Sequence, residues 1–422
     1  MNHARVFELS CGASLVVEPM SGVRSASAQW LVPAGNAHDP ADELGRAELF
    51  SEILLRGAGS RDARTQTDAF DRIGASRSAS AGRFNVSVGV TSLGERMHEA
   101  LSLVADMIFA PRFDADAVEA SKELAVQAIA SLQDDPQQRA VIAARQRHFP
   151  APLDRSGYGV EEHIVRATPE GLADGWRRAA SPKGAIIAVA GAVDADAVHA
   201  RIESLTSGWT GDSAAVALGS DASRGYGHET DASNQVQIIV VHDAPPERHA
   251  DAVLERLHAS VLSGGMSARL FREVREKRAL CYAVNASYAA DRDFGSVTAY
   301  VGTTPERAQE ALDVLVEQLA HARTKAGAAT QNEFARAVTG MKSRLVFSGE
   351  STQGRAAALA ADVFRLGRPR SLAERAEEID SVTLGALHAY SAREDLGRLT
   401  IQTLGPDPLV EPSKDAGSPA HG

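Results

Sequence analysis

Residues 84–107 read FNVSVGVTSLGERMHEALSLVADM, and residues 295–318 read GSVTAYVGTTPERAQEALDVLVEQ. In both stretches apolar residues alternate with other residues before a short turn. These apolar positions are Val86, Val88 and Val90 in one copy and Val297, Ala299 and Val301 in the other. A period of two residues predicts a β-strand with one buried face. Each stretch is therefore expected to form a strand, a turn and a helix.

The helix expected after each strand begins with the same pattern, Glu-Arg-x-x-Glu-Ala-Leu, at Glu95 and at Glu306. The two copies are separated by a constant offset, 306 − 95 = 211 residues. Strand and helix agree at this one offset, which favours duplication of a whole domain. The alternative is that two amphipathic helices rich in Ala, Glu and Leu share only their composition.

The repeat divides the 422 residues into two predicted domains of ordinary size, at 1–210 and 234–405. The range 211–233 between them is rich in Gly, Ser, Ala and Asp and lacks periodicity, as is typical of a linker. The range 406–422 combines prolines with Gly, Ser and charge. Such a composition buries too little surface to offset the entropy of ordering, so we expect a disordered tail.

Each domain is predicted to belong to the α+β class. Strands are expected at 185–190 (AIIAVA) and 236–241 (VQIIVV). Strands that run directly into one another, at 75–90 and 281–301, predict hairpins. We therefore expect two homologous domains, each with a mainly antiparallel sheet backed by helices.

Charge and composition restrict the classes of partner. The formal net charge is −11, whereas nucleic acids and anionic membranes select for basic faces. The two cysteines, Cys11 and Cys281, lie far apart and have no metal or redox spacing. No apolar run at the start resembles a signal peptide, and none elsewhere approaches a membrane span. We expect a cytoplasmic protein, or a periplasmic one if a leader was removed.

The stretch Gly45–Gly57 (GRAELFSEILLRG) resembles the zinc helix of the pitrilysin-type metallopeptidases, the inverted zincins that include mitochondrial processing peptidase. In that family the helix carries His-x-x-Glu-His. Two histidines at i and i+4 hold zinc, and the Glu acts as general base for the attacking water. A more distant Glu completes the ligand set.

The resemblance assigns four positions of this chain to the lost metal chemistry. Glu48 and Glu52 stand where the two histidines would be, Ser51 replaces the catalytic Glu, and Ala128 replaces the third ligand before Asp134-Asp135-Pro136. No zinc is therefore expected in this chain, and no activity of the chain alone. Glu48 and Glu52 could chelate a hard cation, but two charges on a solvated or interface-facing helix are the simpler interpretation.

The stretch Leu262–Val284 (LSGGMSARLFREVREKRALCYAV) is the part most similar to the family. There an Arg and a Tyr seven residues apart reach the substrate at the zinc of the other domain, and Arg275 and Tyr282 match them. A guanidinium can hold a peptide carbonyl or carboxylate, and a phenol can donate to a developing oxyanion. Taken without the resemblance, Arg275 is an exposed charge in a basic run and Tyr282 a half-buried strand aromatic. Ala279 departs from the common Gly, and Cys281 from the common Ala.

The resemblance implies a non-catalytic subunit of a heterodimeric zinc metallopeptidase that cleaves peptides. Arg275 and Tyr282 would serve a homologous partner chain that carries the zinc. A second hypothesis is an inactive scaffold or peptide-binding protein similar to the core subunits of respiratory complexes. A third, a zinc peptidase with relocated ligands, predicts stoichiometric zinc in the purified chain.

Overall fold

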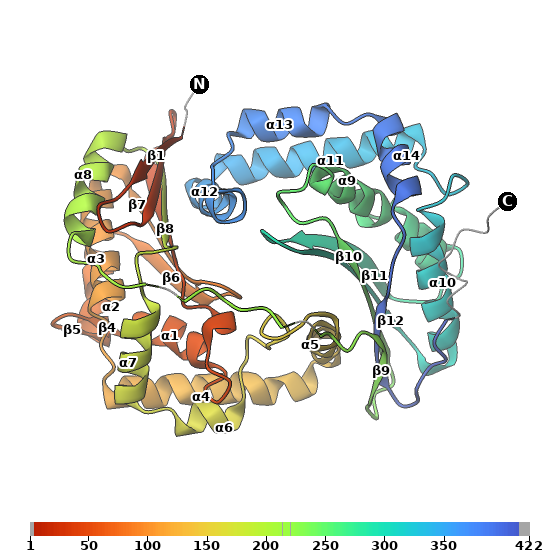
Figure 1. Ribbon diagram of the computed structural model, residues 1–422, viewed down its shortest axis with the longest axis horizontal. Helices are drawn as coiled ribbons and strands as arrows, with labels where there is room; N and C mark the ends of the chain where they lie inside the picture. Colours follow the sequence, from red (N-terminus) through yellow and green to blue (C-terminus); the bar gives the residue numbers. More distant parts are fainter. Residues whose placement is uncertain (1–3, 213, 220, 413–422) are drawn as a thin grey trace. The chain divides into compact units, whose positions relative to one another are not determined.

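The computed structural model describes residues 4–212, 214–219 and 221–412, and their contacts divide the chain into two units (Figure 1). Unit 1 holds the described residues of 1–131, 155–218 and 347–371. Unit 2 holds those of 132–154, 219–346 and 372–422. Each unit therefore includes a segment that lies, in sequence, inside the other half of the chain.

Unit 1 contains a six-stranded sheet. Its strands are β1 (Arg5–Glu8), β2 (Ser14–Pro19), β3 (Ser25–Val32), β6 (Ser76–Ala81), β7 (Val86–Leu93) and β8 (Ile186–Gly191). Across the sheet they lie in the order β1-β2-β8-β3-β7-β6, and only β2 and β8 pair in parallel. A separate ribbon pairs β4 (Gly57–Ala58) with β5 (Arg61–Asp62).

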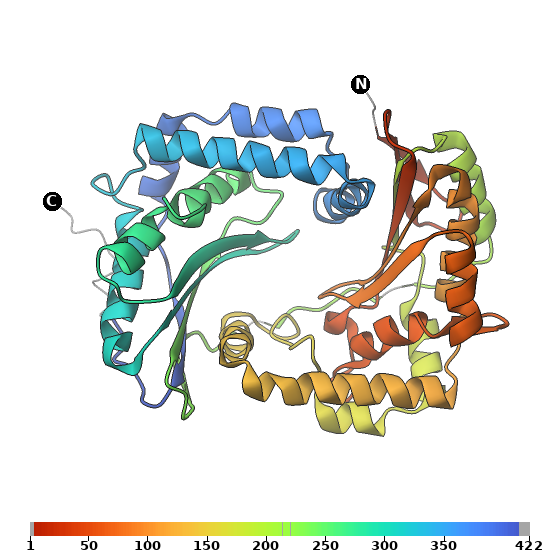
Figure 2. The same cartoon turned by 180° about the vertical axis from the view of Figure 1, so that it is seen from behind.

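The helices of unit 1 lie on both faces of this sheet. They are α1 (Arg46–Leu54), α2 (Ala63–Arg72), α3 (Met97–Phe109), α4 (Ala115–Ser131), α6 (Glu161–Arg166), α7 (Pro169–Ala179), α8 (Ala195–Thr206) and α12 (Thr352–Leu366). The main core gathers α1, α3 and α8 on one face, and α12 alone forms a second apolar cluster on the other (Figures 1 and 2). Because both faces are covered, every residue of β8 is buried.

Unit 2 contains a five-stranded sheet of β9 (Gly225–Thr230), β10 (Val236–Ala244), β11 (Ala283–Ala290), β12 (Gly295–Thr303) and β13 (Thr400–Gly405). The order is β11-β12-β10-β13-β9, and only β13 and β9 pair in parallel. Its helices are α5 (Pro136–His148), α9 (Ala252–Ser263), a π-helix (Phe271–Glu276), α10 (Ala308–His321), α11 (Gln331–Glu350), α13 (Leu372–Asp380) and α14 (Leu384–Arg393). Four short 3-10 turns complete the two units, at Asn36–His38, Gly94–Arg96, Leu132–Asp134 and Pro305–Arg307.

The two sheets share one topology, which confirms the predicted pair of mainly antiparallel α+β layers. The order β2-β8-β3-β7-β6 in unit 1 corresponds to β9-β13-β10-β12-β11 in unit 2. The predicted repeat forms β7 and α3 in one unit and β12 and α10 in the other, each pair joined by a 3-10 turn. Repeated order, direction and turn together identify a duplicated fold.

The two units exchange equivalent helices. Helix α5 comes from the first half of the sequence but packs on β10 and β13 of unit 2, and α12 comes from the second half but packs on β3 and β8 of unit 1. Both helices start sharply, since the side chains of Asp135 and Ser351 accept hydrogen bonds from the backbone N–H groups of Gln138 and Gly354. Their contact faces carry small residues at helical spacing, which lets each helix approach its sheet closely.

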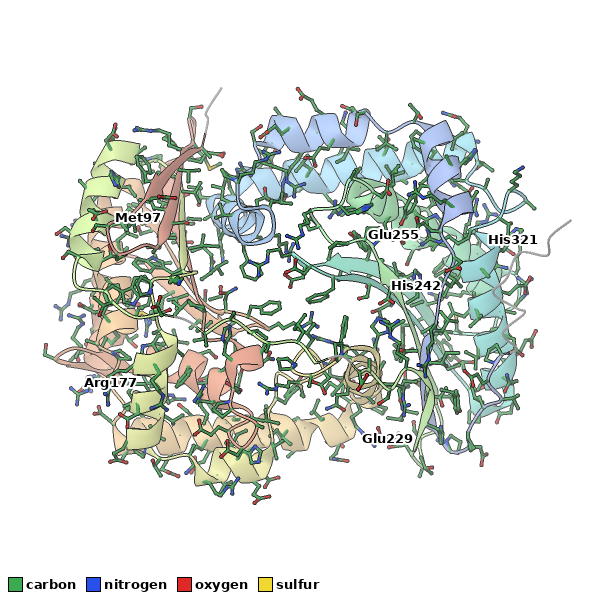
Figure 3. The ribbon with its side chains drawn as sticks, viewed as in Figure 1. Met97, Arg177, Glu229, His242, Glu255 and His321 are labelled. Carbon is green, nitrogen blue, oxygen red and sulfur yellow. The ribbon has the colours of Figure 1, made fainter. Side chains whose placement is uncertain are left out.

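Each exchanged helix is held by an arginine at its fourth position. Arg355 of α12 donates to both carboxylate oxygens of Glu18 in β2, at 2.8 and 2.6 Å. Arg139 of α5 binds Glu229 at the same place in β9, labelled in Figure 3, and also Asp231 at 2.7 Å. The Arg355 side chain is 0% exposed and that of Glu18 is 8% exposed, against 16% for Arg139 and 38% for Glu229. The duplicated fold thus keeps one ion pair in two very different environments.

Several features differ from the sequence predictions. The domains were predicted as continuous ranges, 1–210 and 234–405. In the structure, residues 132–154 belong to unit 2 and residues 347–371 belong to unit 1. Strand β9 lies within the range predicted as linker, where its Gly-Tyr-Gly-His start gives no alternation signal. The other face of β12 is also buried, since α5 covers this part of the sheet.

The predicted disordered tail is described only in part. At its start, the backbone N–H of Leu409 donates to the Tyr226 hydroxyl at 2.6 Å, and that of Val410 donates to Gln309 at 2.8 Å. Residues 406–412 therefore include ordered contacts, and 413–422 lie outside the described residues. Among the helices in the described part of the chain, none has the length and apolar content needed to cross a membrane.

Candidate functional site

Helix α1 in unit 1 carries three of the four positions assigned to lost metal chemistry. Its start is fixed by Asp39, whose carboxylate accepts hydrogen bonds from the backbone N–H groups of Gly45 and Ala47, each at 3.1 Å. Burial raises the pKa of Asp39 to about 7, against the opposing effect of Arg46. Gly45 adopts a φ of +103°, and a Cβ there would meet Ile164 at 2.9 Å, so this turn requires glycine.

Two of the polar side chains at these positions, Ser51 and Glu52, contact groups of their own helix. Burial, and then the neighbouring Glu52, raise the pKa of Glu48, as expected for two carboxylates one turn apart. The buried Ser51 hydroxyl donates to the carbonyl oxygen of Glu48 at 2.9 Å. Glu52 lies 3.7 Å from Arg56 of the same helix. Ala128 is exposed on α4, which packs against α1.

These residues do not fit a zinc ion. Zinc in this class of site needs two imidazoles and a third anionic ligand. Here the first two positions are carboxylates, one of them next to Arg56, and the third, Ala128, has no donor atom. Searched across the described residues, the chain also places no group of three or more His, Cys, Asp or Glu side chains to hold a metal. No hydrolytic step through a metal is therefore derived for this chain.

The stretch Leu262–Val284 in unit 2, termed the donor segment, leads from α9 through a glycine turn into the π-helix and then into β11. Its apolar residues Leu270, Val274 and Leu280 are buried in the main core of unit 2. Most of its polar residues from Arg275 onward are exposed, whereas Arg269 is largely buried. The alternation of buried and exposed positions places Arg275 and Tyr282 at the surface of the unit.

Arg275 stands apart from the other basic residues of the donor segment. Arg272, Lys277 and Arg278 all pair with the carboxylate of Glu273. Within the described part of the chain Arg275 forms no ion pair, and its guanidinium lies 4.8 Å from the centre of the Phe271 ring. Its hydrogen-bonding capacity is therefore free for a ligand.

Tyr282 is the second free donor. Its side chain is 75% exposed, and its hydroxyl has no hydrogen-bond partner among the described residues. Its backbone N–H donates to the carbonyl of Gly302 at 3.3 Å, which fixes the chain at the start of β11. The alternative interpretation of Tyr282 as a half-buried strand aromatic does not agree with this exposure, and Arg275 is exposed as well.

The two departures from the family pattern lie between these donors. Ala279 adopts a φ of +51°, the left-handed region that glycine occupies without penalty. This explains why a glycine is common at this position. The Cys281 thiol is buried, and burial raises its pKa to about 11 although the charge of Arg275 acts in the opposite direction. That effect of its charge indicates that Arg275 lies near Cys281, the residue before Tyr282.

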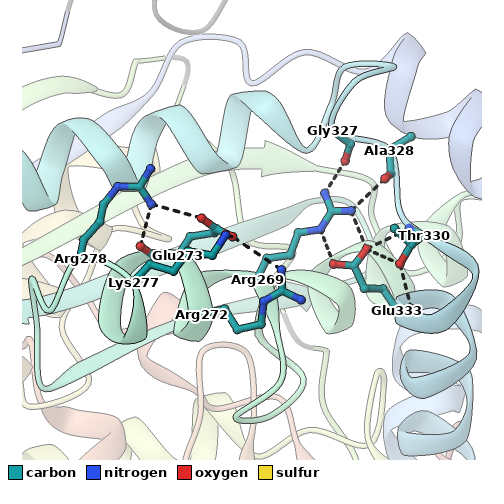
Figure 4. A network of polar contacts seen from close by, with 9 residues as sticks. All are labelled: Arg269, Arg272, Glu273, Lys277, Arg278, Gly327, Ala328, Thr330 and Glu333. Carbon is teal, nitrogen blue, oxygen red and sulfur yellow. Dashed lines mark hydrogen bonds and ion pairs between the residues drawn. The ribbon is translucent and has the colours of Figure 1, made fainter.

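A further polar cluster supports the donor segment and was not predicted from the sequence (Figure 4). Arg269 donates to both carboxylate oxygens of Glu333, at 2.9 and 2.8 Å. It also donates to the carbonyls of Gly327 and Ala328. Glu333 in turn accepts from the backbone N–H of Thr330, whose hydroxyl accepts from the Glu333 N–H. This reciprocal pair is a capping box at the start of α11, and the pattern Thr-x-x-Glu could have signalled it.

Two histidines of unit 2, His242 and His258, are buried in its interior. Glu255 and His242, labelled in Figure 3, are buried with His258 in a polar network that includes Arg323. Burial lowers the pKa of His258 to about 3, so its imidazole is neutral near neutral pH. His242 and His258 are therefore packed residues of the interior.

Comparison with known proteins identifies the family. The model of insulinase (peptidase family M16) matches residues 15–153, and the model of the peptidase M16 inactive domain matches residues 166–341. An uncharacterized zinc protease of Bacillus subtilis (strain 168) is 24% identical over 379 residues, covering 88% of this chain and 91% of its own. An uncharacterized zinc protease of Mycobacterium tuberculosis (strain ATCC 25618 / H37Rv) is 26% identical over 403 residues, covering 94% and 91%.

Solved structures show the same fold. A peptidase M16 inactive domain from Pseudomonas fluorescens superposes with a TM-score of 0.87 at 19% identity, covering 98% of this chain and 100% of that one. A chain of complex III2 from Candida albicans superposes with a TM-score of 0.81 at 15% identity, covering 96% of each. With both family models matched in chain order over a duplicated fold, the chain belongs to peptidase family M16, the pitrilysin-type peptidases.

Proposed function

We propose that this chain is the non-catalytic subunit of a heterodimeric zinc metallopeptidase that cleaves peptides. In this proposal a homologous partner chain carries the zinc and the general base. Arg275 binds a carbonyl or carboxylate of the peptide, and the Tyr282 hydroxyl donates to the oxyanion that forms when water attacks.

The observation that carries the proposal is the free state of both donors. Arg275 is the one basic residue of its run without an ion pair in the described structure, and Tyr282 is 75% exposed without a hydroxyl partner. The segment beneath them is buried and hydrogen-bonded. Free donors on a rigid support are the arrangement that substrate binding requires.

The state of unit 1 supports the assignment of zinc to another chain. Glu48, Ser51 and Ala128 cannot supply two imidazoles, a general base and a third ligand. The neighbouring Arg56 also lies where its charge would repel a cation from Glu52. A subunit that keeps the donors but not the metal ligands has a catalytic use only beside a zinc-bearing chain.

An inactive scaffold or peptide-binding protein is the second candidate. The fold is shared with a chain of complex III2 from Candida albicans over 96% of both lengths. In such a role Arg275 and Tyr282 would have no effect on peptide turnover. Binding to a zinc-bearing chain separates this candidate from the first.

The test combines this chain with an M16 chain that carries His-x-x-Glu-His. Native mass spectrometry is expected to show a 1:1 complex with one zinc, and peptide turnover is expected only from the complex. Arg275→Ala and Tyr282→Phe should each lower kcat/KM by about 10²–10³, the usual cost of one oxyanion donor. Arg272→Ala, which removes a paired arginine of the same segment, is the control.

Unchanged turnover in both donor variants would eliminate the donor role. A homodimer, or a complex with a chain that lacks the zinc motif, would favour the scaffold. Stoichiometric zinc in this chain alone would contradict both and indicate relocated ligands.

A further inference from the structure

We infer that Arg269, which is bound by the carboxylate of Glu333, is a positioning residue that determines the positions of Arg275 and Tyr282. This inference rests on the proposed function of the two donors. It adds a support that neither the family models nor the free state of the donors assigns.

Nearly all N–H groups of the Arg269 guanidinium donate hydrogen bonds. The carboxylate of Glu333 accepts from two of its five N–H groups, and the carbonyls of Gly327 and Ala328 accept from two more (Figure 4). The Arg269 side chain is 12% exposed and that of Glu333 is 8% exposed, so water competes little for these bonds. Burial alone would raise the pKa of Glu333, but hydrogen bonds from Arg269 and Thr330 bring it to about 2. The carboxylate is therefore ionised at every pH at which the protein would act.

The contacts of Arg269 and Glu333 also involve the loop before α11 and the first turn of that helix. Glu333 belongs to the capping box that starts α11, with Thr330 as the capping residue. Gly327 and Ala328 lie in the loop before that helix. Arg269 thus ties the donor segment to the start of α11, which comes about 60 residues later in the chain.

Backbone hydrogen bonds connect Arg269 to the part of the segment that carries Arg275 and leads to Tyr282. The N–H of Arg272 donates to Ala268 at 3.1 Å, that of Lys277 to Arg272 at 2.9 Å, and that of Leu280 to Val274 at 3.0 Å. These bonds span the segment from Arg269 to the residue before Cys281 without a gap. The wider turn of the π-helix lies within this span, between Arg269 and Tyr282.

The far end of the donor segment is tied separately. The Thr303 hydroxyl donates to the carbonyl of Leu280, and Arg307 donates to the carbonyl of Ala279. Arg275 lies between this tie and the Arg269 anchor, and Tyr282 follows directly after the tie. Since neither donor has a polar partner of its own, the segment alone determines where the two side chains stand. A displacement of about 1 Å at such groups can cost about 10² in rate.

Cys281 offers a probe of this positioning in the chain by itself. Its thiol is buried on the donor segment, and its raised pKa keeps it largely protonated and slow to react. In a Cys11→Ser background, N-ethylmaleimide reports Cys281 alone. Arg269→Met should speed its alkylation at pH 8 by about tenfold or more, since loosening the segment exposes the thiol and restores its ordinary acidity.

Further variants distinguish loosening of the donor segment from a general loss of stability. Lys342→Met removes the exposed ion pair between Lys342 of α11 and Asp380 of α13, and it should leave the alkylation rate of Cys281 unchanged. Cys11, measured in a Cys281→Ser background, reports unit 1 and should react at its wild-type rate in Arg269→Met. Glu333→Asp keeps the carboxylate and should recover part of the protection that Glu333→Gln loses.

The complex with a zinc-bearing M16 chain tests the link to the donors. Arg269→Met should lower kcat by about 10–100-fold while KM changes less than about threefold. In a Tyr282→Phe background the same change should lower kcat by a smaller factor than in the wild-type chain, because part of its effect acts through a donor that is already lost.

The outcomes separate the two proposals. If Arg275→Ala and Tyr282→Phe do not change turnover, the proposed function fails. If those variants reduce turnover but Arg269→Met changes neither kcat nor the Cys281 rate, the positioning role is overturned. Faster alkylation with undiminished kcat, or full additivity with Tyr282→Phe, would also overturn it.

Discussion

Helix α1 in unit 1 and the donor segment in unit 2 lie in two copies of one fold, and their polar side chains are in opposite states. On α1, Ser51 bonds its own helix and Glu52 lies beside Arg56. On the donor segment, Arg275 and Tyr282 are free, while the residues beneath them are tightly held. At the positions assigned to lost metal chemistry, Ser51 and Glu52 contact groups of their own helix, whereas the two side chains proposed as substrate donors have no polar partner among the described residues.

The exchanged helices, α12 in unit 1 and α5 in unit 2, allow a second comparison between the two units. Both are secured by an arginine at the fourth helical position and a glutamate at the fifth strand position. In unit 1 the pair is buried, and in unit 2 it is partly exposed. The duplicated contact is therefore expected to differ in energy between the units.

The largest effect is expected from Arg355→Met, which leaves Glu18 buried without a partner and should destabilise unit 1 by about 3–5 kcal/mol. Arg139→Met should cost about 1 kcal/mol, since its partner Glu229 remains accessible to water. All three tryptophans, Trp30, Trp176 and Trp209, belong to unit 1, so tryptophan fluorescence during urea unfolding measures the loss in Arg355→Met. Circular dichroism during the same unfolding also follows unit 2 and measures the loss in Arg139→Met. Equal losses in the two variants would refute the difference in environment.

Glu333→Gln should destabilise unit 2 by about 2–3 kcal/mol, because Arg269 loses its ionised partner. The folded-state pKa of Glu333, about 2, lies below the ordinary value. Its contribution is therefore complete above the ordinary pKa and is lost as the pH falls towards 2. Circular dichroism melting at pH 7 and pH 3 should show the gap between wild type and variant narrowing at the lower pH. Asp380→Asn, at an exposed pair, is the control, and a gap that widens in acid would count against the Arg269–Glu333 contact.

Ala279→Gly should stabilise the chain by about 0.5–1 kcal/mol. The left-handed φ of +51° costs alanine more than the flexibility of glycine costs the folded state. The change should also slow alkylation of Cys281, because the donor segment becomes more rigid. A destabilised variant would show that Ala279 is not strained.

The smallest effect is expected at the lost metal position, where Glu48→Gln should stabilise unit 1 by about 0.5 kcal/mol at pH 8. The pKa of Glu48 is raised in the folded state, so the native chain loses stability as the pH rises through the titration of this group. The gain should vanish at pH 4, where the carboxyl is protonated. Tryptophan fluorescence during urea unfolding at the two pH values measures this gain in stability. Glu119→Gln, at an exposed position of α4, is the control.

Local patterns in the sequence were sufficient for the repeat and for both hairpins. The alternation at Val86, Val88 and Val90 and the shared helix start depend only on neighbouring residues, and the structure confirms both. The exchange of α5 and α12 could not be predicted in this way. An apolar stripe shows that a helix covers a sheet, but it does not say which of two similar sheets.

The candidate site shows the same limit. The resemblance to the family pointed to Arg275 and Tyr282, yet the absence of an ion pair at Arg275 depends on Glu273, which pairs with the other three basic side chains of the run. The contact of Arg269 with Glu333 joins residues 64 apart, and no periodicity links them. The pattern Thr-x-x-Glu from Thr330 to Glu333 marks the start of α11 in the sequence, but it does not indicate that Arg269 binds there.

The most direct test of the central claim compares two variants within one complex with a zinc-bearing M16 chain. One variant removes the remaining polar groups of the lost metal site, Glu48→Gln with Ser51→Ala and Glu52→Gln. The other removes the donors, Arg275→Ala with Tyr282→Phe. The division between the units predicts kcat/KM within about twofold of wild type for the first, and a loss of about 10² or more for the second. A large loss in the first variant, or full activity in the second, would contradict it.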